Sequence, residues 1–248
     1  MGRVAVVTGG ASGIGLAICH HLAGSGCHIA VLDVDGDAAE EAATGLRRSD
    51  VPAVAVPVDV ADGDSVVKAM DRTRQRLGPI SILVTSAGIA PFEPFESISL
   101  ESWNRVLAVN LTGTFLCVQA AVPDMVAAEW GRIVTISSSS AQTGAPRMGH
   151  YVASKGGVIA LTRSLAREYG AHGITVNTIP PSSIDTPMMD DARQAGHLTD
   201  NAAIVARTPV GRIGTPDDIA ATCAFLCSDT AGYISGQVIG VNGGSVIS

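Results

Sequence analysis

Hydrophobic and polar positions occur in blocks along the chain: short apolar runs are separated by longer segments in which apolar residues recur at helical spacing. Strands that are apolar throughout are covered on both faces, and regular alternation of strands and helices requires right-handed crossovers between parallel strands. The pattern therefore predicts an α/β fold on one doubly wound parallel sheet. The predicted strands are VAVVT (4–8), IAVLD (29–33), AVAVPVD (53–59), ISILVTS (80–86), RIVTISS (132–138) and GITVNTI (173–179).

The C-terminal third continues this pattern with one interruption. A helix is expected after Thr215, which can cap it, with Pro216 at its first position, and QVIGVN (237–242) predicts a final strand. Between them and the sixth strand, residues 180–214 show no regular pattern, and irregular segments of that length are usually lids or binding loops. No linker or repeat divides the chain, so we expect a single domain of residues 1–248 with a substrate lid at 180–214.

Composition excludes some partners. The 248 residues carry a net charge of −7, so the chain lacks the basic patch that nucleic acids or anionic membranes attract. The N-terminal MGRVAVVTGG resembles neither an export signal nor a membrane span, and a cytoplasmic location is expected. The five cysteines and six histidines lack metal-ligand spacing, so no metal is predicted and the cysteines are interpreted as small buried residues.

A glycine-rich turn follows the first strand and opens a helix. In TGGASGIG (8–15), Gly9, Gly13 and Gly15 allow a sharp turn and bring backbone amides close to a bound pyrophosphate. Asp33 ends the second strand, eighteen positions after Gly15, where a carboxylate accepts hydrogen bonds from both hydroxyls of an adenosine ribose. No Lys or Arg occurs at 8–32 or 34–43 to neutralise a 2′-phosphate, so the motif favours NAD(H) over NADP(H).

A second motif, GHYVASKGG (149–157), places Tyr151 and Lys155 four residues apart on a predicted helix. Residues at this spacing share one helix face, and an ammonium group near a phenol lowers the pKa of the phenol. The pair is a candidate for proton transfer. His150 points in a different direction from its neighbour and is a candidate pocket-wall residue.

Together, TGxxxGIG, VDV (58–60), YxxxK and SGQVIGVNGG (235–244) resemble the classical short-chain dehydrogenase/reductase family over the whole chain. The resemblance implies a Rossmann-type fold, hydride transfer between NAD(H) and a secondary alcohol or ketone, and a homotetramer. It places catalytic roles on Asn110 in VLAVNLTG, on Ser138, thirteen residues before the tyrosine, and on Tyr151 and Lys155. It implies that the cofactor contacts Gly9, Ser12, Gly13, Ile14, Gly15, Asp33, Asp59, Val60, Ser86, Ala87, Gly88, Tyr151, Lys155, Ile184 and Thr186.

The residue types suit these roles. Ser138, at the end of a strand, can hydrogen-bond a substrate oxygen, and Tyr151 can give or take the proton of that oxygen. By resemblance, Lys155 also holds the nicotinamide ribose, Asn110 anchors a water that links Lys155 to solvent, and Thr186 reaches the nicotinamide carboxamide. Met188 and Met189 in the expected lid can pack on varied apolar groups.

Three positions depart from the family pattern. TSAG (85–88) has Ser86 where the family has asparagine, PPSS (180–183) replaces a usual Pro-Gly, and Asn242 replaces a common aspartate. None is one of the four catalytic positions.

Alternatives remain open. The chain is also compatible with a 3-oxoacyl reductase acting on a carrier protein or coenzyme A thioester, although acidic carrier proteins would meet an acidic chain. A catalytically silent NAD-binding regulator would have no need of the tyrosine hydroxyl. A nucleotide-sugar epimerase is disfavoured because such chains carry a longer C-terminal domain. The sequence does not specify the alcohol or ketone.

Overall fold

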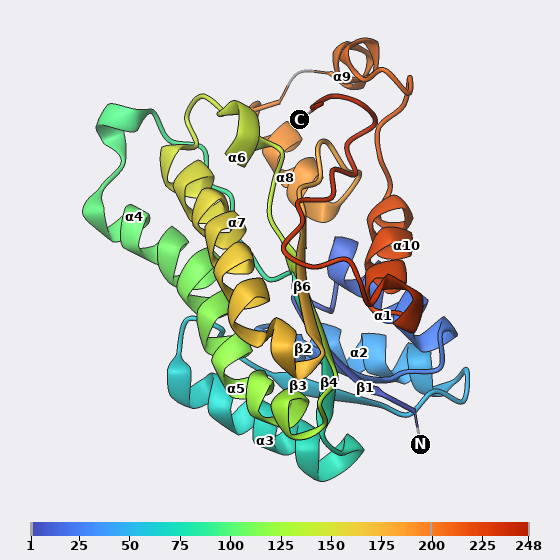
Figure 1. Cartoon of the computed structure of the whole chain (residues 1–248). Coiled ribbons are helices and arrows are strands. Elements are labelled where there is room, and N and C mark those ends of the chain that lie inside the picture. Colours follow the sequence, from blue (N-terminus) through green and yellow to red (C-terminus); the bar gives the residue numbers. More distant parts are fainter. Residues whose placement is uncertain (1, 199, 248) are drawn as a thin grey trace.

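A computed structural model describes residues 2–198 and 200–247, and it has an α/β fold around one six-stranded parallel sheet (Figure 1). All six strands predicted from the apolar runs before residue 180 are present, each within two residues of its predicted ends. Their order in the sheet is β3-β2-β1-β4-β5-β6. The strands are β1 (Val4–Thr8), β2 (His28–Asp33), β3 (Ala53–Pro57), β4 (Ile80–Thr85), β5 (Gly131–Ile136) and β6 (Ile174–Ile179).

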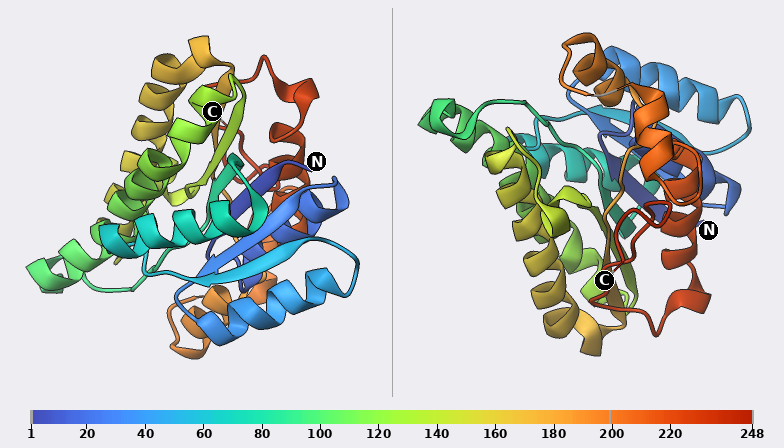
Figure 2. Two further views of the ribbon diagram at one scale, coloured as in Figure 1. Left: turned by 90° about the horizontal axis from the view of Figure 1, so that it is seen from below. Right: turned by 90° about the horizontal axis from the view of Figure 1, so that it is seen from above.

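Helices connect the strands and cover both faces of the sheet (Figures 1 and 2). Their bounds are α1 (Gly13–Gly24), α2 (Gly36–Arg47), α3 (Gly63–Leu77), α4 (Leu100–Leu107), α5 (Gly113–Ala127), α6 (Ser140–Thr143), α7 (Gly149–Tyr169), α8 (Pro187–Gln194), α9 (Asn201–Arg207) and α10 (Pro216–Leu226). Short 3-10 turns cover Phe95–Ser97, Gly170–His172 and Asp229–Ala231, and a π-helical turn covers Ala108–Thr112.

Two hydrophobic cores lie on opposite faces of the sheet. Helices α1, α2 and α10 pack on one face, where Ile18, Leu22 and Ile219 are buried. Helices α3, α5 and α7 pack on the other, where Met70 and Met125 are buried. The strands supply residues to both cores, which explains why their sequences are apolar throughout.

The strand order reverses beside β1, because β1 pairs with β2 on one side and with β4 on the other. In open α/β sheets, ligands bind at the carboxyl ends of the strands next to such a reversal. The glycine-rich turn follows β1 and TSAG overlaps the end of β4. The topology therefore brings these two motifs to the same crevice.

The predicted final strand is only partly formed. Residues 237–242 run beside β6 but pair through isolated bridges, Thr178 with Val238 and Pro181 with Val241. The neighbouring chain explains why no continuous ladder forms. Pro180 and Pro181 have no amide hydrogen to donate, so backbone pairing cannot continue regularly past the end of β6.

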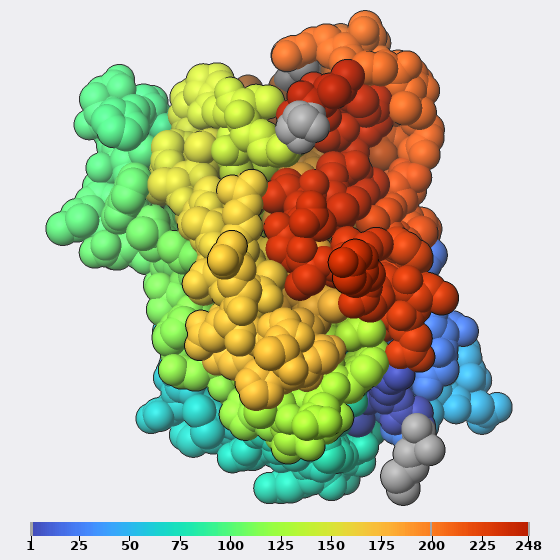
Figure 3. All heavy atoms as spheres, viewed as in Figure 1, coloured from blue at the N-terminus to red at the C-terminus, as the bar shows by residue number. Residues whose placement is uncertain are grey.

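The 180–214 segment is more regular than predicted, because it contains α8 and α9. Helix α8 starts at Pro187 with Thr186 as its cap, and Asp200 caps α9 by accepting a hydrogen bond from Ala203 N at 2.8 Å. Both caps were visible in the sequence, but each helix is eight residues or fewer and gives too short an apolar pattern to detect. In the space-filling view, the red C-terminal segment lies directly against this orange segment (Figure 3).

Residues Leu100–Ala127 form one nearly continuous helical run through α4, the π-helical turn and α5. By length and composition alone this run is apolar enough to cross a membrane. In the fold it packs on β4 and against α3 and α7, and 44% of its most apolar window is buried. Its apolar character is therefore accounted for by its place in the core layer.

Candidate active site

The glycine-rich turn has the geometry that its sequence predicted. Gly9 has φ +63°, a conformation that residues with a side chain rarely adopt. A Cβ at Gly15 would lie 2.0 Å from the carbonyl oxygen of Gly9, so only glycine fits there. Ser12 caps α1 without a side-chain hydrogen bond, which leaves the first amides of the helix available to an anion. These features fit a pyrophosphate.

Asp33 is held beside this turn. Its Oδ2 accepts a hydrogen bond from Ala11 N at 3.1 Å, and its Oδ1 accepts one from Asp35 N at 3.2 Å. Each carboxylate oxygen keeps a further lone pair, and the side chain lines the cavity. The geometry therefore fits a carboxylate that receives two ribose hydroxyls.

Thr8 joins the ends of β1 and β4. Its hydroxyl oxygen accepts hydrogen bonds from the amides of Ser86 and Ala87, each at 3.2 Å. Because residue 86 makes this link through its backbone amide, the link does not depend on having an asparagine side chain there. The sequence interpretation missed Thr8, although its place directly before the glycine-rich turn was a signal.

Asn110 lies in the π-helical turn and is fully buried. Its side-chain oxygen accepts from Ile89 N at 2.9 Å, and its amide donates to Ile89 O and to Ser154 Oγ, each at 3.0 Å. It thereby ties the segment after β4 to α7 from behind the cavity wall. A Cβ at Gly88 would lie 3.2 Å from Asn110 Oδ1 and 3.4 Å from Lys155 Nζ, so these two side chains flank Gly88.

Ser138 and Tyr151 meet at the centre of the crevice. Ser138 follows β5, and its hydroxyl lies 2.8 Å from that of Ser140. Burial raises the pKa of Tyr151, and its hydrogen bond with Ser138 opposes that rise. The serine therefore interacts with the phenol as well as facing the space where a substrate oxygen would bind.

Lys155 is almost completely buried, and its ammonium group donates to Ile136 O at 2.8 Å. Burial lowers its pKa to about 8. Its Nζ is 5.9 Å from the centre of the Tyr151 ring. The sequence led us to expect that this lysine lowers the pKa of the tyrosine. The balance here is different, since burial dominates the pKa of Tyr151 and Ser138 supplies the opposing effect.

His150, which the sequence made a candidate for the pocket wall, is not among the residues that line the cavity. It is fully buried, and its Nδ1 accepts a hydrogen bond from Tyr151 N at 2.9 Å. Its Nε2 lies 3.5 Å from Glu93 Oε1, outside hydrogen-bond geometry. His150 therefore packs behind the first turn of α7 and satisfies one of its free amides.

A cavity of about 1020 Å³ joins these groups. That volume is at the upper end of the range for ligand sites and suits an elongated dinucleotide with a small substrate. Its wall includes every residue expected to contact the cofactor, together with Ser138, whereas Asn110 lies behind it. The cavity is also lined by apolar side chains, namely Ala90, Phe92, Met148, Met188, Met189, Leu198 and Ile204. Of these, the sequence had singled out only the two lid methionines.

Within the described residues, no group of three or more His, Cys, Asp or Glu side chains is arranged to hold a metal ion. The five cysteines are free and buried, as interpreted from the sequence. Burial raises the pKa of Cys27 to about 11 and that of Cys117 to about 12, which makes both thiols poor nucleophiles.

Comparison with known proteins matches nearly the whole chain. The family model described as enoyl-(acyl carrier protein) reductase matches residues 9–246. The cis-4-hydroxycyclohexanecarboxylate dehydrogenase of Sinomonas cyclohexanicum is 41% identical over 98% of this chain and 96% of that protein. The D-threitol dehydrogenase of Mycolicibacterium smegmatis is 40% identical over 99% and 94%. The crystal structure of gox2181 has a TM-score of 0.93 at 35% identity and covers 98% of this chain and 95% of that one.

These matches extend through the sheet, the crevice and the segment above it, so they concern the whole fold. The protein is an oxidoreductase of the dehydrogenase or reductase type. It belongs to the short-chain dehydrogenase/reductase family.

Proposed function

We propose that this protein is an NAD(H)-dependent secondary-alcohol dehydrogenase or ketone reductase. The observation that carries the proposal is the meeting of Ser138, Tyr151 and Lys155 in one crevice with the glycine-rich turn and Asp33. The nicotinamide would supply the hydride acceptor or donor when bound. Gly9, the first amides of α1 and Asp33 would hold its pyrophosphate and adenosine ribose, with Asp59 and Val60 near the adenine.

The protein side chains then handle the substrate oxygen and its proton. Ser138 donates a hydrogen bond to that oxygen, and Tyr151 gives it a proton during ketone reduction or removes one during alcohol oxidation. A raised pKa keeps Tyr151 protonated at neutral pH, so the phenol is ready for reduction. Oxidation needs the phenolate, so its rate should rise with pH. Lys155 and Thr186 would orient the nicotinamide end.

The homotetramer and the cytoplasmic location belong to the same proposal. Phe115 on the outer side of α5 is 44% exposed, and a subunit contact would cover it. The five reduced, buried cysteines fit a reducing compartment. We expect the protein to act on small-molecule substrates and to have neither nucleic acid nor a membrane as a partner.

A second candidate is the reduction of a 3-oxoacyl thioester. The description of the matched family model names an acyl carrier protein substrate, and the apolar side chains that line the cavity would accept an acyl chain. Kinetics with acetoacetyl-CoA against simple ketones separate the two candidates. A silent cofactor-binding protein is disfavoured because Ser138, Tyr151 and Lys155 are all present and line the same cavity.

Replacing the tyrosine tests the proposed function. Tyr151→Phe keeps the ring and removes the transferable proton, so turnover of a panel of cyclic, aromatic, steroid and 3-oxoacyl compounds should fall about 10²- to 10⁴-fold. Affinity for NADH, measured by fluorescence titration, should barely change. A variant that keeps more than about half of the activity would show that another group transfers the proton.

Cofactor preference gives a separate prediction. Asp33 should favour NAD(H) over NADP(H) by at least about 10²-fold in kcat/KM, through its ribose contacts and its repulsion of a 2′-phosphate. Asp33→Ala should narrow this ratio by losing activity with NADH, while Asp37→Ala, a nearby exposed change of equal charge, should leave it unchanged. Faster turnover of the unmodified enzyme with NADPH than with NADH at equal low concentration would refute the preference.

A further inference from the structure

The segment over the crevice contributes a single charged side chain to the cavity. Residues 180–214 contain four aspartates, three arginines and one histidine. Of these eight, only Arg207 lines the cavity within the part of the chain that the structure describes. The charged members of the segment are Asp185, Asp190, Asp191, Asp200, Arg193, Arg207, Arg212 and His197.

The other two arginines have partners elsewhere. Arg193 forms an ion pair with Asp190 and donates to Asn201 Oδ1 at 2.9 Å. Arg212 forms an ion pair with Asp218 at 2.6 Å. Among residues 2–198 and 200–247, no hydrogen bond or ion pair is formed by the side chain of Arg207, so its donors are available to a ligand.

Arg207 belongs to the part of α9 that faces the cavity. Ile204, Arg207 and Thr208 all line the cavity, and their spacing of three and four residues puts them on one helix face. The chain after the helix is anchored to the C-terminal segment, because Val210 N donates to Gly243 O at 3.1 Å. The same C-terminal segment adds Ser245 and Val246 to the cavity wall.

The rest of this wall accommodates an apolar body. The acidic residues that line the cavity are Asp33 and Asp59, both on the side assigned to adenosine. The segment over the crevice also contributes Met188, Met189 and Leu198 to the cavity wall. A ligand that is apolar along most of its length and negatively charged at one end matches this arrangement.

We propose that the substrate is an anionic secondary alcohol or ketone, with an apolar body that ends in a carboxylate, and that Arg207 binds this carboxylate. Arginine donates two parallel hydrogen bonds to a carboxylate, which fixes orientation as well as charge. Arg207 thus determines specificity for the acid by contributing to its binding. This inference rests on the proposed function.

Binding without turnover provides the main test. Hydroxy acids and their uncharged amides would be titrated into the NADH-loaded enzyme, in which an alcohol cannot be oxidised, and followed by calorimetry. The probes are 3-hydroxybutyrate, 4-hydroxycyclohexanecarboxylate and 4-(1-hydroxyethyl)benzoate. At least one acid should bind about 10- to 100-fold more tightly than its amide, and Arg207→Met should remove most of that difference. Arg207→Lys should keep part of it.

Two variants and one kinetic comparison sharpen the result. Arg48→Met makes the same charge change at an exposed position outside the cavity and should change nothing, whereas Arg105→Met tests the other arginine in the wall, which comes from α4. With NAD⁺, Arg207→Met should raise KM for the acid and leave kcat nearly constant, and added salt should do the same in the unmodified enzyme.

Three outcomes would overturn the inference: no acid binds better than its amide, the preference depends on Arg105, or Arg207→Met impairs only the reduction of acetoacetyl-CoA. The third outcome would mean that Arg207 binds the phosphates of coenzyme A. Failure of the proposed function is a different result, namely that no neutral or charged alcohol in the panel is oxidised with NAD⁺.

Discussion

At the scale of single residues, burial governs the two groups proposed for proton transfer, because it raises the pKa of Tyr151 and lowers that of Lys155 to about 8. Ser138, Tyr151 and Lys155, which line one cavity, could be proposed from the sequence because the family motif places a serine thirteen residues before the tyrosine and a lysine four residues after it. Thr8 and His150 act by accepting hydrogen bonds from backbone amides, two at Thr8 and one at His150, and such contacts leave no periodic signal in a sequence. The pKa of Tyr151 also could not be predicted from the i, i+4 spacing, because it depends on how deeply the fold buries the phenol.

The buried ammonium of Lys155 leads to a prediction about stability. Its pKa is about 8 in the folded protein against 10.5 for a solvent-exposed lysine, so the unfolded chain binds more protons between these pH values and stability rises with pH across that window. Below pH 8 the full penalty applies, on the order of 3 kcal/mol at 1.36 kcal/mol per pKa unit. Lys155→Met should remove this penalty and, if the proposed role of the lysine holds, should also abolish catalysis.

Urea unfolding of the cofactor-free proteins would measure the effect. The stability of Lys155→Met relative to the unmodified protein should be most favourable at pH 7 and decline by about 3 kcal/mol as the pH approaches 10.5. Lys68→Met, at an exposed position on α3, serves as the control and should show no such trend. Parallel stability curves for Lys155→Met and the unmodified protein would mean that the lysine is not desolvated in solution.

At the scale of elements, the sheet was predictable and the segment above it was not. Strands that are buried on both faces must be apolar throughout, so the six strands could be predicted from the apolar runs in the sequence. The pairing of residues 237–242 depends on two prolines in another part of the chain, and α8 and α9 are too short for helical periodicity to appear. Local caps were the available signal for these helices, since Thr186 precedes Pro187 and Asp200 precedes Asn201.

This segment should behave as a lid. His197 stacks on Phe92 of the segment after β4, with ring centres 4.9 Å apart, so a contact spans the crevice. Bound cofactor and substrate would add contacts to Thr186 and the methionines, and closure would exclude water from the hydride. Hydrogen exchange of peptides covering 184–205 should therefore slow when NADH and a substrate ketone analogue are added, while peptides from α3 stay unchanged. Equal protection in both states would identify the segment as permanent scaffold.

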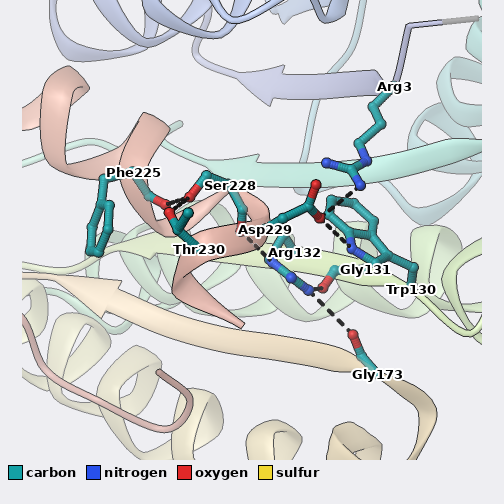
Figure 4. A network of polar contacts seen from close by, with 9 residues as sticks. All are labelled: Arg3, Trp130, Gly131, Arg132, Gly173, Phe225, Ser228, Asp229 and Thr230. Carbon is teal, nitrogen blue, oxygen red and sulfur yellow. Dashed lines mark hydrogen bonds and ion pairs between the residues drawn. The ribbon is translucent and has the colours of Figure 1, made fainter. Parts of the chain in front are cut away.

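At the scale of the whole molecule, a network at the amino ends of the strands, opposite the crevice, joins Arg3 near the N-terminus to Asp229 after α10 (Figure 4). The ring of Trp130 lies between two guanidinium groups, with Arg3 3.7 Å and Arg132 4.4 Å from its centre. Asp229 pairs with Arg3 at 2.8 Å and accepts from the Trp130 indole at 3.1 Å. Buried Arg132, whose pKa is lowered by desolvation, donates to the carbonyl of Gly173.

Because Trp130 directly precedes β5 and Ser138 follows its other end, the network and the site are separated by a strand about 20 Å long. Trp130→Leu removes two cation–π contacts and leaves Arg132 less well covered, so the free energy of unfolding should fall by about 2 to 4 kcal/mol. That loss corresponds to a Tm lower by about 5 to 15 °C for a chain of this size. Trp130→Phe keeps a ring between the arginines and should lose less stability.

Calorimetry would measure the Tm of both variants, and their kcat at 25 °C should stay within about twofold of that of the unmodified enzyme. A fall in kcat at a temperature where Trp130→Leu is fully folded would show that the network around Trp130 is energetically coupled to the crevice.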